Sequence, residues 1–108
     1  MNTPDVEAII TFLKTEDGGR TTPCYSGYRP NHLIKDDYLT SGIHSYYEKD
    51  IVYPGESVFG TIKYITPEVY PNCLWEGKII KIQEGSKIIG HAEITKILND
   101  ILRINKTH

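Results

Sequence analysis

The side chains that could carry chemistry in this sequence are four histidines, two cysteines and several loop hydroxyls. Cys24 or Ser26 followed by His32 could imitate a nucleophile and its base, because a thiol or hydroxyl needs a nearby imidazole to take its proton. No carboxylate stands at a recognisable spacing to orient that imidazole. We therefore expect Cys24 and Ser26 to be loop residues, and we expect the protein not to be an enzyme.

The same residues show no spacing of metal ligands. Zinc sites are typically built from pairs such as CxxC and HxxxH, and no such pair is formed by His32, His44, His91, His108, Cys24 and Cys73. The glycine-rich segments lack the lysine of a GxxxxGK[ST] phosphate-binding loop, which argues against GTP hydrolysis. We expect neither a metal nor a cofactor.

Composition limits the organisation of the chain. Its 108 residues suit one domain, and 39% hydrophobic with 24% charged residues is close to the globular average. A net charge of −2 argues weakly against a surface that follows a polyphosphate throughout. Two distant cysteines, and an N-terminus without a basic segment before an apolar run, predict a reduced, cytoplasmic protein. No apolar stretch approaches the roughly 20 residues that cross a bilayer, so we expect no membrane partner.

Apolar alternation predicts the strands that would position any site. Residues 6–13 place Val6, Ala8, Ile10 and Phe12 on one face of an extended segment. A turn at 53–56 leads into a second strand at 57–65. Residues 78–83 and 87–97 predict a hairpin around a turn at 84–86.

Other segments are less regular. We expect a long ordered loop or a set of turns over 15–28 and a short edge strand over 45–52. Pro67 and Pro71 argue against any helix between them. The last ten residues, 99–108, predict one helical turn or a tail. Several short strands separated by glycine and proline turns predict an all-β protein, and we favour a barrel because closure removes exposed edges.

Three separated pieces of the sequence resemble one family, in order. They are GGRTTP with GYRP at 18–23 and 27–30, YPGESV at 53–58, and QEGSKIIG at 83–90. Together they resemble the third domain of translation elongation factor Tu, over about residues 5–98. The first piece carries Gly18, Gly19, Pro23, Gly27, Tyr28, Arg29 and Pro30. The resemblance implies a six-stranded antiparallel barrel with Greek-key connections over 1–98, followed by the 99–108 segment.

The resemblance also implies an RNA- or partner-binding set, which consists of Arg20, Asn31, Thr40, Glu84 and Gly85. The match is incomplete, because Thr21 replaces a family His, Asn31 a family Gln and Gln83 a family Arg. We favour the alternative that Arg20, Arg29 and Glu84 tie loops to each other. Phosphate contacts are made largely by Arg and Lys, and of Arg20, Thr40 and Glu84 only Arg20 is basic.

A second implied surface faces the GTPase domain in the family, and it corresponds here to Ile79, Lys81 and Gln83. Ile79 replaces a family Arg, and Lys81 replaces a small residue. We interpret this face as rebuilt for water or for a different partner, and neutral drift remains the alternative. A further alternative surface is offered by the eight tyrosines, for which we rank packing first, protein interfaces second and base stacking third.

These observations predict a non-catalytic binding module that acts on a component of the translation machinery. Its partner is expected to be tRNA, a translation factor or a protein that recognises one. The alternatives are a mimic or decoy of the elongation factor, for example an immunity-like or regulatory protein, and a remnant of a larger factor. The sequence determines neither the partner nor the oligomeric state.

Overall fold

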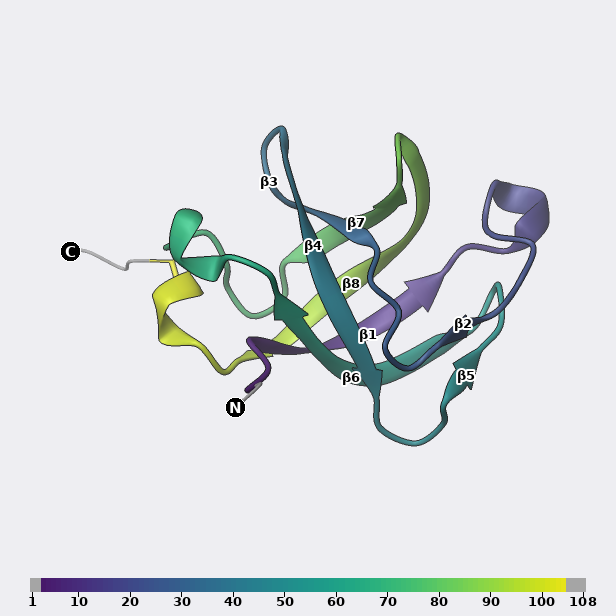
Figure 1. The fold of residues 1–108 in the computed structure, drawn as a ribbon, viewed down its shortest axis with the longest axis horizontal. Helices are drawn as coiled ribbons and strands as arrows, with labels where there is room; N and C mark the ends of the chain where they lie inside the picture. Colours follow the sequence, from purple (N-terminus) through teal and green to yellow (C-terminus); the bar gives the residue numbers. More distant parts are fainter. Residues whose placement is uncertain (1–2, 105–108) are drawn as a thin grey trace.

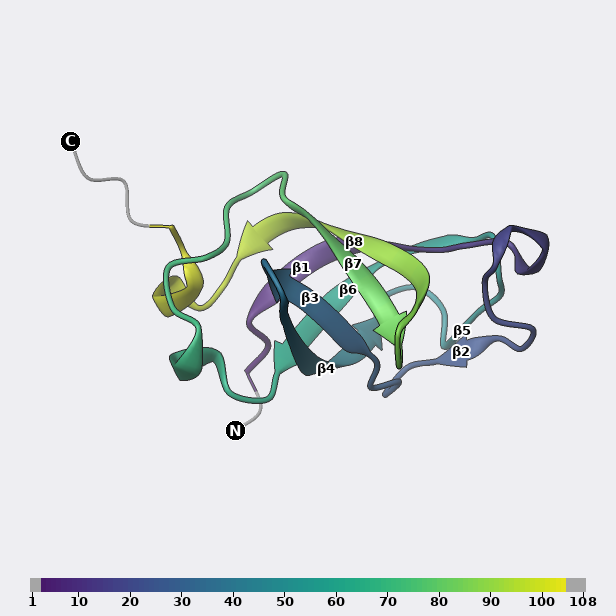
Figure 2. The same ribbon diagram turned by 90° about the horizontal axis from the view of Figure 1, so that it is seen from above.

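Six strands close into an antiparallel barrel in the computed structural model, which describes residues 3–104 (Figures 1 and 2). The neighbours around the barrel follow the order β1-β6-β4-β3-β7-β8. β3, β4 and β6 form a meander, and β6 then pairs with the first strand, β1, which gives the Greek-key connection expected above. The bounds are β1 Val6–Phe12, β3 Asn31–Lys35, β4 Tyr38–Tyr46, β6 Ser57–Tyr64, β7 Ile79–Glu84 and β8 Lys87–Ile97.

Alternating side chains fill the interior of the barrel. All four inward residues predicted for β1 are buried, and β6, β7 and β8 supply inward Ile62, Ile80, Ile82 and Ile94. Glycines allow the strands to approach closely: a Cβ on Gly60 or Gly90 would overlap a backbone oxygen of the neighbouring strand. The tyrosines divide between packing and exposure, since Tyr46, Tyr64 and Tyr70 are buried whereas Tyr25, Tyr47 and Tyr53 are exposed.

The two ends of the barrel carry different additions. At one end lie the 3-10 turn η1 (Thr15–Asp17) and the ribbon of β2 (Cys24–Tyr25) and β5 (Ile51–Val52), as Figures 1 and 2 show. At the other end the 3-10 turns η2 (Pro67–Val69) and η3 (Asp100–Leu102) pack together. Leu102 is buried in the core, and its carbonyl accepts hydrogen bonds from the Cys73 and Leu74 N–H groups. The predicted helical turn is therefore a packed 3-10 turn, and residues 105–108 lie outside the described range.

Two sequence predictions about local structure are wrong. The expected strand over 45–52 is the end of β4, a bend and then β5. β4 begins at Tyr38 because Asp37 takes a left-handed φ of 57° and closes a β3–β4 hairpin. The prolines do not prevent every helix either, because Pro67 starts η2, where a missing N–H has no intrahelical partner to lose.

Candidate functional site

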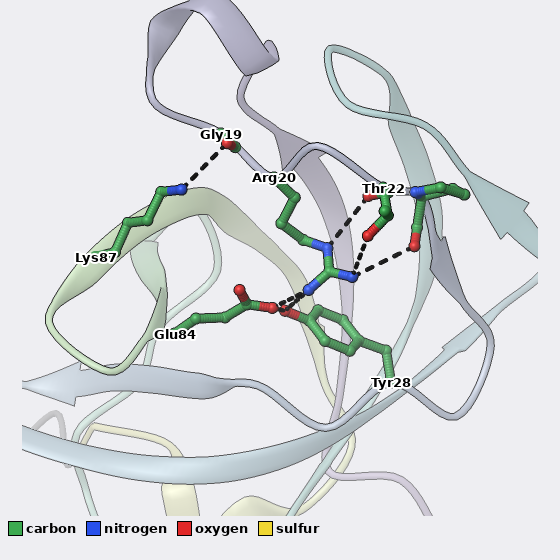
Figure 3. Close-up of polar contacts among 7 residues, drawn as sticks. Gly19, Arg20, Thr22, Tyr28, Glu84 and Lys87 are labelled. Carbon is green, nitrogen blue, oxygen red and sulfur yellow. Dashed lines mark hydrogen bonds and ion pairs between the residues drawn. The ribbon is translucent and has the colours of Figure 1, made fainter.

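Arg20 joins the loop after η1 to the β7–β8 hairpin (Figure 3). Its guanidinium forms an ion pair with Glu84 and donates to the Thr22 hydroxyl over 2.9 Å and to the Thr22 carbonyl over 3.3 Å. Gly19 directs this loop, since a Cβ there would overlap the backbone oxygen of Leu13. For Arg20 and Glu84 the geometry is that of the loop tie favoured above, whereas the Arg29 side chain is exposed and forms no hydrogen bond or ion pair with the described residues.

Tyr28 completes this arrangement from the second part of the motif. Its hydroxyl donates a hydrogen bond to Glu84, and the guanidinium carbon of Arg20 lies 5.0 Å from its ring centroid. Burial raises the pKa of Tyr28 above its usual value, and the bond to Glu84 raises it further. Lys87 adds a contact from the hairpin to the Gly19 carbonyl over 3.3 Å. Glu84 thus accepts from two donors of the loop at once.

The remaining residues of the implied binding set lie around this point with different exposures. Gly85 forms the hairpin turn beside Glu84, with a φ of 60°. Asn31 pairs with Gln83 across β3 and β7, and its side-chain oxygen accepts from Ser41. Thr40 is 6% exposed, and its hydroxyl is hydrogen-bonded to the Tyr70 hydroxyl over 2.7 Å. The structure brings Arg20, Glu84 and Gly85 together and turns Thr40 into the core.

A buried histidine pair, missed in the sequence, continues the arrangement into the barrel. The Nε2 atoms of His32 and His44 lie 2.9 Å apart, and His44 Nδ1 lies 2.9 Å from the Tyr46 hydroxyl. The Tyr28 ring packs edge-on against His44, with 5.8 Å between centroids. Gly42 leaves room for the His32 ring, because a Cβ at this position would lie 2.8 Å from His32 Cε1. We refer to Arg20, Tyr28, Glu84, His32, His44 and Tyr46 together as the polar cluster.

Burial keeps both imidazoles neutral. It lowers the pKa of His32 to about 4 and holds the pKa of His44 well below its usual value. His32 Nδ1 has no hydrogen-bond partner among the described residues. Because each neutral imidazole carries one N–H, one Nε2 of the pair donates to the other.

Cys24 and Ser26, which were considered above for covalent chemistry, lie in and next to β2, at the end of the barrel that carries the β2–β5 ribbon. Burial raises the pKa of the Cys24 thiol to about 11, so the thiol is protonated at neutral pH. The Ser26 hydroxyl accepts a hydrogen bond from the Tyr46 N–H. Within residues 3–104, no three His, Cys, Asp or Glu side chains gather where they could hold a metal ion. Over the same range, no helix is long and apolar enough to cross a membrane.

A groove lies next to the point where β3 and β7 pair, beside the chain that precedes β7. It encloses about 380 Å³. Ile79 is 61% exposed, Trp75 is 43% exposed, and Lys81 is exposed at the same place. We use the name groove for the site lined by Leu33, Lys35, Trp75, Ile79, Lys81 and Ile104. It includes two residues of the predicted rebuilt face.

These features define a closed all-β barrel with a polar cluster inside one end and an apolar, lysine-bearing groove outside. No protein-family model matches the sequence.

Proposed function

We propose that the protein is a non-catalytic, cytoplasmic binding module that acts on a protein component of the translation machinery. The resemblance of its motifs to the third domain of elongation factor Tu supplies the connection to translation. The ion pair between Arg20 and Glu84 carries the choice of a protein over tRNA. A phosphate contact needs a free cation, and here the one basic side chain among Arg20, Thr40 and Glu84 is engaged within the chain.

The absence of catalysis is supported by the same geometry. The Cys24 thiol is protonated and buried, and the two histidines nearest to it in sequence are neutral and bonded to each other. A general base must reach the proton that it removes, whereas His32 and His44 are enclosed in the barrel.

The partner that we propose is a translation factor or a protein that recognises one. In the second case the chain acts as a mimic, which binds the protein that recognises the factor and takes the factor's place. Exposed Ile79 and Lys81 favour this version, because a face that differs from the family pattern would bind differently. Binding energy would come from the apolar side chains, since interface cores are rich in aromatic residues and poor in charge.

The test is to immobilise the purified protein and pass cytosolic extract from its own host over it at low salt. Both RNA and protein in the retained fraction are then analysed. We expect a discrete protein and no tRNA. Retained tRNA that elutes as the salt concentration rises would contradict the proposal, because counterion release makes phosphate contacts salt-sensitive.

A further inference from the structure

The groove presents apolar side chains between cations. Leu33 and Lys35 come from β3, Ile79 and Lys81 from β7, and Trp75 and Ile104 from the flanking chain. β3 and β7 pair at Asn31↔Gln83 and His32↔Ile82, and the groove lies beyond these two pairs, toward Lys35 and Ile79. Exposed side chains of both strands and of the flanking chain line this place, and they offer the contacts for recognition.

The Trp75 ring packs against Lys78, whose ammonium is itself fixed by hydrogen bonds. Lys78 donates to the Ile34 and Cys73 carbonyls over 2.9 and 2.8 Å, and its ammonium lies 4.7 Å from the Trp75 ring centroid. This lysine is used within the chain, which leaves Lys35 and Lys81 as the exposed cations of the groove. Asp36 is the acidic residue among the side chains around it.

We propose that the groove binds an extended acidic segment of a partner protein. An aliphatic or aromatic side chain of the segment packs against Trp75 and Ile79, and its carboxylates pair with Lys35 and Lys81. This inference rests on the proposed function in so far as it assumes a protein partner. The exposed lysines favour a segment with negative charge, and the exposed apolar residues favour a segment that also carries apolar side chains. A nucleic-acid strand fits less well, because two exposed lysines beside Asp36 offer few phosphate contacts.

The test uses fluorescein-labelled decapeptides of alternating Glu and Leu, with anisotropy as the readout. Trp75 is the single tryptophan of the chain, so its emission reports on the groove directly. We expect the Glu–Leu peptide to bind and to shift this emission. Matched Lys–Leu and Glu–Ser peptides should bind at least roughly tenfold more weakly, because each lacks one of the two contacts.

Variants locate the binding. Lys35→Glu/Lys81→Glu and Trp75→Ala should each weaken Glu–Leu binding roughly tenfold or more. Lys63→Glu, which lies outside the groove on β6, should leave it unchanged. Circular dichroism of each variant checks that the barrel is intact. Absent binding of the Glu–Leu peptide, equal affinity for the double lysine variant, or displacement of the peptide by a uridine decamer would overturn the proposal.

A repeat of the extract capture separates this proposal from the proposed function. If the wild type and the Lys35→Glu/Lys81→Glu variant retain the same protein equally, the groove assignment is wrong and the binding function stands. If the wild type retains no protein at all, the binding function fails, whatever the peptides show.

Discussion

The polar cluster and the groove both place a cation over an aromatic ring, Arg20 over Tyr28 and Lys78 over Trp75. They differ in their other charges, which are paired within the polar cluster and exposed in the groove. In the polar cluster Arg20 and Tyr28 both donate to Glu84, and the two histidines bond to each other. In the groove Lys35 and Lys81 are exposed beside Trp75 and Ile79. The difference teaches that Arg20, Tyr28 and Glu84, which belong to the sequence motifs described above, lie in the part of the molecule that holds the fold together. Substitutions in the polar cluster should therefore change stability, and substitutions in the groove should change binding.

The largest effect should follow acidification, through the histidine pair. The pKa of His32 in the folded state is about 4, and the unfolded value is about 6.5. The unfolded state therefore binds more protons between these values, and stability falls as the pH falls below 6.5. His32 alone should lower the free energy of unfolding by about 2 kcal/mol from pH 7 to pH 5, and His44, shifted in the same direction, should add to this loss.

Urea unfolding across this pH range measures the loss, and the ring chemical shifts of His32 and His44 report their protonation. The pKa values of Glu56 and Glu76 are lowered from 4.5, so these carboxylates titrate below the window. Equal stability at pH 7 and pH 5, or a charged imidazole at pH 5 in the folded state, would show that the pair is not held neutral.

The next effect should come from removing the acceptor of the loop tie. Glu84→Ala leaves the part-buried Arg20 guanidinium and Tyr28 hydroxyl without their shared partner. We expect a loss of about 2 kcal/mol in the free energy of unfolding, measured by urea denaturation. Glu84→Gln keeps one acceptor oxygen and should lose less. If both variants are as stable as the wild type, the motif is not a loop tie and Arg20 is available to a ligand.

A smaller effect is expected at the hairpin turn. Gly85 has a φ of 60°, and the position that a Cβ would take has nothing within 4 Å. Gly85→Ala therefore meets no clash and costs only the left-handed strain, about 1 kcal/mol. Gly85→Asn is the matched control and should cost less, because Asn tolerates this region better. An alanine variant that unfolds at the wild-type urea concentration would mean that the turn relaxes to another geometry.

The smallest effect on stability is expected in the groove. Lys81→Ala removes an exposed side chain of β7, and the free energy of unfolding should stay within about 0.5 kcal/mol of the wild type. Thermal and urea unfolding are sufficient to measure this. A loss comparable to that of Glu84→Ala would erase the distinction between the two regions.

The sequence predicted the fold better than the sites. β1 was predicted because apolar residues alternate along its whole length, and β6 and the β7–β8 hairpin were predicted because their segments rich in isoleucine and valine adjoin glycine-containing turns. β3 and most of β4 were missed, because inward His32, Thr40, Gly42 and His44 break that alternation. The histidine pair depends on the β3–β4 register, which the turn at Asp37 fixes and no local pattern reveals.

The polar loop contact was easier to predict than the groove. Arg20 and Glu84 belong to separate motifs flanked by glycine and proline, where fixed backbones need polar partners, and the two side chains form an ion pair. Arg29, for which the same role was predicted, is exposed. Ile79 and Lys81 were identified only as a changed face. Their neighbours Trp75 and Ile104 come from irregular chain, which backbone hydrogen bonds of Leu74 with Leu102 and Ile104 hold together.

Titration of purified tRNA against the protein tests most directly the claim that Arg20 serves the fold and not a phosphate. Labelled bulk tRNA is titrated at low and at physiological salt, with anisotropy as the readout. We predict no binding in the micromolar range at either salt concentration. Micromolar binding that weakens steeply with salt, by several counterions per tRNA, would contradict the account and restore an RNA-binding function.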